Sequence, residues 1–286
     1  MRISSRIMAE NVKSNLNRLA DQILTTEKRI VTGKKINKPS DDPAGMTRVL
    51  DYRRTISTIE QYQENITLGT NRIKYSETIL ENAHKLLRQA KQIASNPGTD
   101  DKASLAREVE NIKTQILGFA NTKYNNTYIF SGTATDTTPF ASDGTYSGST
   151  GEKKFIIGEN MDVRIEADGR EIFTDGTNNL FDVLDTLQTA LNADDMTTIK
   201  SQVARLDSID DNLNEKRASM ASSYNRMEST KKHWTNFKVD MQDLLSSTED
   251  ADIAQAAIDL KVQQTTYEVA LAVSAKIIQP TLMNFL

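Results

Sequence analysis

Few residues of this chain could carry chemistry, and their spacing does not join them into a site. The two histidines, His84 and His233, stand in polar helical stretches with no second metal ligand three or four residues away, so both are expected at the surface. The run GSTGEK at 148–153 resembles a phosphate-binding loop but lacks the GxxxxGK[ST] spacing, which favours a solvated hairpin loop.

The acidic pairs admit mostly structural interpretations. Asp100-Asp101 and Asp194-Asp195 each follow a turn and precede a helix, where carboxylates interact favourably with the N-terminal dipole. Asp210-Asp211 lies within a helix, and a cation site there stays open as an alternative. Spacing nominates no nucleophile–base pair, and aromatic residues are not interleaved with basic ones as nucleic-acid binding requires. We therefore expect no catalytic residue, no cofactor or metal site and no nucleic-acid partner.

The composition favours narrow helical seams over one thick core. Apolar residues make up 37% and aromatic residues 6% of the 286 residues. The absence of cysteine excludes disulfides and thiolate metal sites. No apolar run approaches the roughly 18–20 residues of a membrane span. The residues at the start alternate between apolar and polar types, so we expect no cleavable signal peptide and no membrane insertion.

The two ends of the chain carry opposite charge. Residues 1–38 contain nine basic and three acidic residues, and residues 240–286 contain seven acidic and two basic ones. Pairing of the ends with each other, or with those of neighbouring copies, is the favoured interpretation. Two independently solvated surfaces remain the alternative.

Each end also carries an apolar stripe at helical spacing. The N-terminal stripe has no aromatic residue before Tyr52, so it is suited to a partner helix more than to a globular core. We predict that the two stripes form an assembly interface, in which Ile3, Ile7, Leu16, Leu19, Ile23 and Ile30 pack against Leu260, Tyr267, Leu271, Ile278, Leu282 and Phe285.

A turn with two prolines separates the first two helices. In the segment Pro39, Ser40, Asp41, Asp42 and Pro43, the second aspartate is a good N-cap and the second proline a good first helical residue. Helical periodicity then runs to Ser95, and Asn96-Pro97-Gly98 is a strong stop.

The middle of the chain changes in texture. Seven of the twelve glycines fall between Thr127 and Asn178. Residues 161–168 alternate between apolar and polar types, which predicts a half-buried strand, and Asp168-Gly169 is interpreted as a hairpin turn leading to Ile172 and Phe173. Residues 128–130 and 155–157 are further strand candidates.

A long helix is expected over residues 196–245, about 75 Å in length. The predicted fold is therefore mainly α with a small β-rich insert, an elongated helical bundle or coiled coil of nested N- and C-terminal helices. Its predicted parts are an N-terminal assembly helix and turn (1–42), a helical rod in two halves (43–126 and 179–248), a β-rich outer insert (127–178) and a C-terminal assembly helix (249–286).

Several motifs resemble a known family. The segments RISS at 2–5 and EKRIVTGKKINKPSDDPAG at 27–45 resemble the N-terminal region of flagellins and their junction relatives. The two prolines of the turn, together with YIFSGT at 128–133 and Pro139-Phe140, are similar to the hook-associated protein 3 family, which is flagellin-like. The C-terminal part, with Tyr267 and SAKI at 274–277, fits the same family.

The resemblance implies a structural role. It implies N- and C-terminal helices that pair in the inner tube of the flagellar axis, and type III export to the extracellular hook–filament junction without a cleavable signal. The implied partners are copies of the chain itself, hook-associated protein 1, flagellin and a cytoplasmic export chaperone. Filament flagellin is the nearest alternative. An intracellular coiled-coil scaffold and an enzyme built on the β insert are more distant ones.

Overall fold

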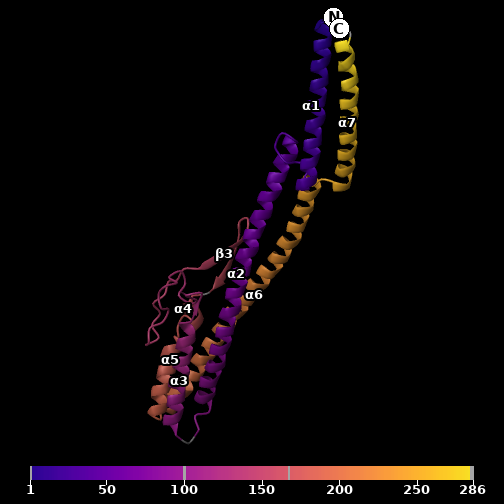
Figure 1. The fold of residues 1–286 in the computed structure, drawn as a ribbon. Helices are drawn as coiled ribbons and strands as arrows, with labels where there is room; N and C mark the ends of the chain where they lie inside the picture. Colours follow the sequence, from indigo (N-terminus) through magenta and orange to yellow (C-terminus); the bar gives the residue numbers. More distant parts are fainter. Residues whose placement is uncertain (1, 99–100, 167, 284–286) are drawn as a thin grey trace. The chain divides into compact units, whose positions relative to one another are not determined.

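The computed structural model is mainly helical and describes residues 2–98, 101–166 and 168–283. Two compact units make up the fold: unit 1 is Met1–Thr58 with Phe237–Leu286, and unit 2 is Ile59–Asn236. The elements follow one another as α1 (Arg2–Thr32), α2 (Pro43–Ser95), α3 (Lys102–Ala120), β1 (Lys123–Tyr124), β2 (Thr127–Tyr128), β3 (Lys153–Gly158), β4 (Met161–Glu166), α4 (Gly169–Phe173), α5 (Leu180–Asn192), α6 (Met196–Glu249) and α7 (Ile253–Met283) (Figure 1). The expected class, mainly α with a small β-rich insert, is confirmed.

Unit 1 contains the terminal helices. In it α1 and α7 lie side by side, and they are joined through short loops to the start of α2 and the end of α6 (Figure 1). Helix α1 ends before Gly33, whose φ of 70° is the left-handed conformation that commonly terminates a helix. Helix α2 begins at Pro43, and the Asp42 carboxylate accepts a hydrogen bond of 2.9 Å from the Gly45 N–H, which confirms the predicted N-cap.

Unit 2 contains most of the buried apolar side chains. The predicted stop after Ser95 is confirmed, and α3 follows it, capped by Asp101. Helix α3 packs against α5 in this unit. The seam continues along α2 and α6, where the buried side chains recur at helical spacing: Ile66, Ile73, Leu80 and Leu87 on α2, and Ile199, Leu206, Leu213, Met220 and Met227 on α6.

The β insert consists of two small antiparallel hairpins. β1 pairs with β2, and β3 pairs with β4 with Phe155 opposite Val163. The β3–β4 hairpin is attached to the helices by side-chain donors: Asn65 Nδ2 donates to the Ile156 carbonyl at 2.9 Å, and Trp234 Nε1 donates to the Ile157 carbonyl at 2.7 Å. The strand predicted from alternation over 161–168 is present as β4, which ends at Glu166, and the strand predicted at 155–157 lies within β3.

Two details of the predicted insert were wrong. Asp168-Gly169 is not a hairpin turn, because the Asp168 carboxylate caps α4 by accepting from the Glu171 N–H at 2.9 Å. The β3–β4 turn lies instead around Asn160, which has a φ of 55°. The strand predicted over 128–130 ends at Tyr128, and the next two residues are buried without belonging to a strand.

Four phenylalanines form a compact aromatic core beneath the insert. Phe130, Phe140, Phe173 and Phe181 are fully buried, and their ring centroids lie 5.1–5.9 Å apart in the pairs that join Phe140 to Phe173 and Phe181, and Phe130 to Phe173. This distance range suits favourable aromatic contacts. Because Phe181 belongs to α5, this core attaches the loops of the insert to a helix of unit 2.

Across the described part of the chain, none of the helices combines the length and the apolar character that a membrane span requires.

Candidate assembly surface

Helices α1 and α7 pack against each other, and most of the described residues of the predicted interface are partly buried. Leu16, Leu19, Ile23 and Ile30 of α1 are partly buried. On α7, Leu260 and Tyr267 are partly buried as well. The structure thus pairs the two terminal helices within one chain, and direct packing of one stripe on the other stays a prediction.

Other members of the predicted interface lie elsewhere. Ile7 is 51% exposed and Leu271 is 44% exposed, so neither is covered within the chain. The side chains of Ile3, Ile278 and Leu282 and the whole of Phe285 lie outside the described residues. Whether this set forms an interface between copies stays a prediction.

Helix α7 carries a second apolar stripe that the sequence analysis missed. Ile258, Val262, Val269 and Val273 are 59%, 59%, 57% and 49% exposed and follow one another at spacings of four, seven and four residues. At about 100° per residue this set faces away from Leu260 and Tyr267. The signal was available, because the apolar residues of α7 are not confined to one side. We call these four residues the outer stripe.

Helix α1 is different on its outward side. Leu24 and Val31 are 61% and 85% exposed, seven residues apart, and they lie among charged residues such as Lys13 and Lys28. The pair of terminal helices therefore presents a largely apolar side on α7 and a mixed, charged side on α1. Exposed apolar patches of this kind mark interaction sites.

The opposite charges of the chain ends meet at the loops and not along the helices. Helix α1 contains six basic and three acidic residues, but α7 contains two of each. Among the described residues no ion pair joins α1 to α7, whereas Lys34 of the α1–α2 loop lies 2.8 Å from the carboxylate of Glu249 at the end of α6. The acidic character of the C-terminal region thus comes mainly from the end of α6 and the loop after it.

The loop between α1 and α2 is built around Asp41. Its carboxylate Oδ2 accepts hydrogen bonds of 3.0 Å from the N–H groups of Asn37 and Lys38. Partial burial alone would raise the pKa of Asp41, but these backbone N–H groups outweigh it and lower the pKa. Together with the Asp42 cap, the two aspartates of the turn motif fix the entry into α2.

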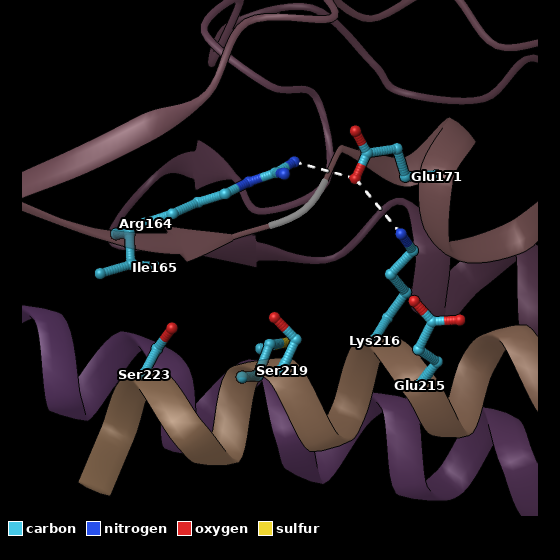
Figure 2. A pocket seen from close by; sticks show the side chains of 8 residues that line it. Arg164, Ile165, Glu171, Glu215, Lys216, Ser219 and Ser223 are labelled. Carbon is cyan, nitrogen blue, oxygen red and sulfur yellow. Dashed lines mark hydrogen bonds and ion pairs between the residues drawn. The ribbon is translucent and has the colours of Figure 1, made fainter. Parts of the chain in front are cut away.

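The remaining polar clusters form ion pairs that stabilise the fold. His84 is not a free surface residue, since its Nε2 lies 2.9 Å from Oδ1 of Asp210 and both side chains are only 17% exposed. A pocket of about 90 Å³ lies between β4, α4 and α6 in unit 2. Figure 2 shows its Arg164 and Lys216 side chains reaching the same carboxylate oxygen of Glu171, at 3.0 and 3.8 Å. These ion pairs attach the insert to α6.

Within the described ranges no three His, Asp or Glu side chains are grouped as metal ligands. The candidate interaction surface is the exposed side of α7 with its outer stripe.

Comparisons with known proteins agree with this architecture. The N-terminal helical region of bacterial flagellin matches residues 3–135, and the C-terminal helical region matches residues 203–286. Both regions are present at the ends of the nested fold, and the chain belongs to the flagellin family.

Within that family, the chain is similar to flagellar hook-associated protein 3 of Escherichia coli, with 29% identity over 187 residues. That alignment covers 63% of this chain and 59% of the relative, which is less than two thirds of the relative's length. A flagellin of Halalkalibacterium halodurans is 24% identical over 267 residues, covering 91% of this chain and 89% of that protein. A solved flagellar hook-associated protein from Vibrio parahaemolyticus shares the fold, with a TM-score of 0.68 and 18% identity over 73% of this chain and all of the other.

Proposed function

We propose that the chain is a structural subunit of the bacterial flagellum that joins the hook to the flagellin filament. The observation that carries the proposal is the paired α1 and α7 with the uncovered outer stripe, on a chain that is similar to hook-associated protein 3. Apolar side chains that remain half exposed on an ordered helix are stabilised when another subunit covers them.

In this role the subunit contacts copies of itself laterally. It meets hook-associated protein 1 on the hook side and flagellin on the filament side. A head-to-tail interface of this kind propagates on a helical lattice and does not close into a dimer. The subunit catalyses no reaction.

Export and location follow from the same role. The chain passes through the flagellar type III channel without a cleavable signal peptide, after holding by a cytoplasmic export chaperone, and it resides outside the cell at the junction. The predicted interface residues of α1 and α7 and the turn from Pro39 to Pro43 serve this assembly.

Filament flagellin is the competing function, because a flagellin is similar to this chain along most of its length. Gold labelling of the chain on intact flagella, viewed by electron microscopy, separates the two. We expect a narrow band of label at the proximal end of the filament. Label along the whole filament would make the chain a flagellin, and unlabelled flagella would argue for a scaffold inside the cell.

A further inference from the structure

The two breaks in the helices of unit 1 lie against each other and form a joint. The Lys35 N–H donates to the Glu249 carbonyl at 2.8 Å, and the Ala251 N–H donates to the Gly33 carbonyl at 2.9 Å. Lys34 and Asp250 are antiparallel bridge partners between these two bonds. The loop after α1 and the loop after α6 are therefore bonded to each other, although more than 200 residues separate them in the sequence.

Glu249 is buried at the centre of this joint. Its residue is 5% exposed, and its Oε1 lies 2.8 Å from Lys34 Nζ and 2.5 Å from Arg53 Nη2. One of the two cations belongs to the α1–α2 loop and the other to α2. A single carboxylate oxygen thus connects three segments: the end of α6, the loop that follows α1, and the first turns of α2.

The stability of α6 does not account for a carboxylate at this position. Glu249 is the last residue of α6, where the helix dipole favours a cation, and the last turn of α6 contains no basic residue. Burial adds a desolvation cost that is recovered only when the charge is well paired. The two cations therefore explain why a buried carboxylate is stable at the end of α6.

The charge cluster is accompanied by a few other contacts at the two loops. The buried apolar side chains around it are Ile36, Val49 and Ala256, and a bridge between two short segments is marginally stable alone. Lys35 adds one hydrogen bond of 2.8 Å from Nζ to the Ser247 carbonyl. The charge cluster at Glu249 adds two ion pairs that join the end of α6 to the α1–α2 loop and to α2.

We propose that Glu249 is a positioning residue for the assembly surface. Through Lys34 and Arg53 it locks the joint from which α1 leaves and to which α7 is attached, so that the two helices stay together and present the outer stripe in one orientation. This inference rests on the proposed function for its role in assembly, but the lock itself is a property of the isolated chain.

A double substitution with a second-site rescue tests the lock. Lys34→Met with Arg53→Met leaves the carboxylate buried without its two cations, whereas adding Glu249→Gln removes the buried charge as well. If the ion pairs of Glu249 keep the joint closed, the double variant opens it. The triple variant closes the joint again, because a buried neutral amide costs less free energy than an unpaired buried charge. A matched control replaces the exposed Lys13 and Arg48 by methionine.

Spin labels provide the readout, since the chain contains no cysteine and two introduced ones are the only attachment points. Labels at the exposed positions Thr47 and Gln255 report the distance from the start of α2 to the start of α7, both within unit 1. We expect a single narrow distance distribution in the parent chain, the control and the triple variant, and a broad one in the double variant. Amide exchange of residues 33–36 should rise by about tenfold or more in the double variant alone.

A broad distribution in the parent chain, or a triple variant as broad as the double, would overturn the lock. Gold labelling of the same variants in cells tests whether Glu249 positions the assembly surface. The double variant should be absent from the junction, and the triple variant should be present there again. If both form normal junctions while the label distances change as expected, Glu249 does not position the surface and the inference fails, although the proposed function stands. If the parent chain is absent from the junction, the proposed function fails, and the lock is still decided by the label distances.

Discussion

Replacing Val262 and Val269 by aspartate should abolish assembly and leave the isolated chain folded. The two side chains are 59% and 57% exposed, so a subunit that covers them would bury a little more than half of each. Full burial of a valine is worth about 1.5–3 kcal/mol, which gives about 1 kcal/mol for each uncovered portion and about 2 kcal/mol for the pair. Two carboxylates inside the same contact would add a cost of several kcal/mol each if they are unpaired.

Together these costs lower the association constant by at least about a thousandfold, since each 1.4 kcal/mol changes it tenfold. In the isolated chain both positions are exposed, and the stability should change by no more than about 0.5 kcal/mol. The assay has two parts: urea unfolding of the purified chain followed by circular dichroism, and gold labelling of flagella in cells that produce only the variant. Leu68→Asp in unit 2 is the matched control, because Leu68 is 49% exposed on α2.

Normal junctions in the double variant would refute the assembly role of the outer stripe. A large loss of stability in the isolated variant would refute its outward orientation. We expect Leu68→Asp to assemble as the parent chain does, and a failure there of the same size would show that the effect is not specific to α7.

Further predictions concern unit 2 and can be measured by urea unfolding. Gly132→Ala should lower the free energy of unfolding by more than about 2 kcal/mol, because φ is 65° and the added methyl group would collide with a backbone carbonyl. Gly118→Ala is its control: Gly118 lies in α3 with open space around it, so the substitution should raise the free energy of unfolding by about 0.5–1 kcal/mol. Trp234→Phe should cost about 1 kcal/mol by removing the donor to the Ile157 carbonyl, and an unchanged midpoint would contradict this. Burial alone would raise the pKa of Asp175, but hydrogen bonds from neighbouring side chains and N–H groups hold that pKa far below its usual range. This carboxylate therefore stabilises the fold above about pH 4 and loses its effect as the pH falls, so Asp175→Asn should cost about 1 kcal/mol at pH 7 and less at pH 3.

The inward sides of the terminal helices could be predicted from the sequence, because a stripe at spacings of three and four is a local property. Leu16, Ile23 and Tyr267 follow that pattern and are partly buried in the structure. The outer stripe of α7 obeys the same spacing, so its signal is present in the sequence as well. Two apolar sides on one helix indicate two partners, and Val262 and Val269 lie on the side that α1 leaves exposed.

The error at Asp168 has a physical reason. An Asp-Gly pair suits both a hairpin turn and the start of a helix, so local chemistry does not distinguish the two. Burial decided the outcome, because Ile172 and Phe173 are completely covered, and Phe173 packs against Phe130 and Phe140 in the aromatic core. That core comes from segments far apart in the chain and could not be derived from periodicity.

The joint at Glu249 could not be predicted from the sequence either, because its contacts are between distant segments. Its partner Arg53 is 196 residues away, and nothing near Glu249 in the sequence indicates that the carboxylate is buried. The charge count of the chain ends predicted that opposite charges meet, and the structure places that meeting at one residue pair, Lys34 with Glu249, instead of along α1 and α7.

Unit 2 is one uninterrupted segment, residues 59–236, inserted between the two halves of unit 1. This arrangement sets an order in time for a chain that is made or threaded from its N-terminus. Unit 2 has all of its residues available while α1 still lacks α7, and closing a loop of this length adds an entropic cost to their pairing. The paired α1 and α7, which form the proposed assembly surface, are therefore completed last, and a chain interrupted before α7 would contain a folded unit 2 and an unpaired α1. If the proposed assembly surface is correct, the nested order restricts assembly to chains that have been completed through α7.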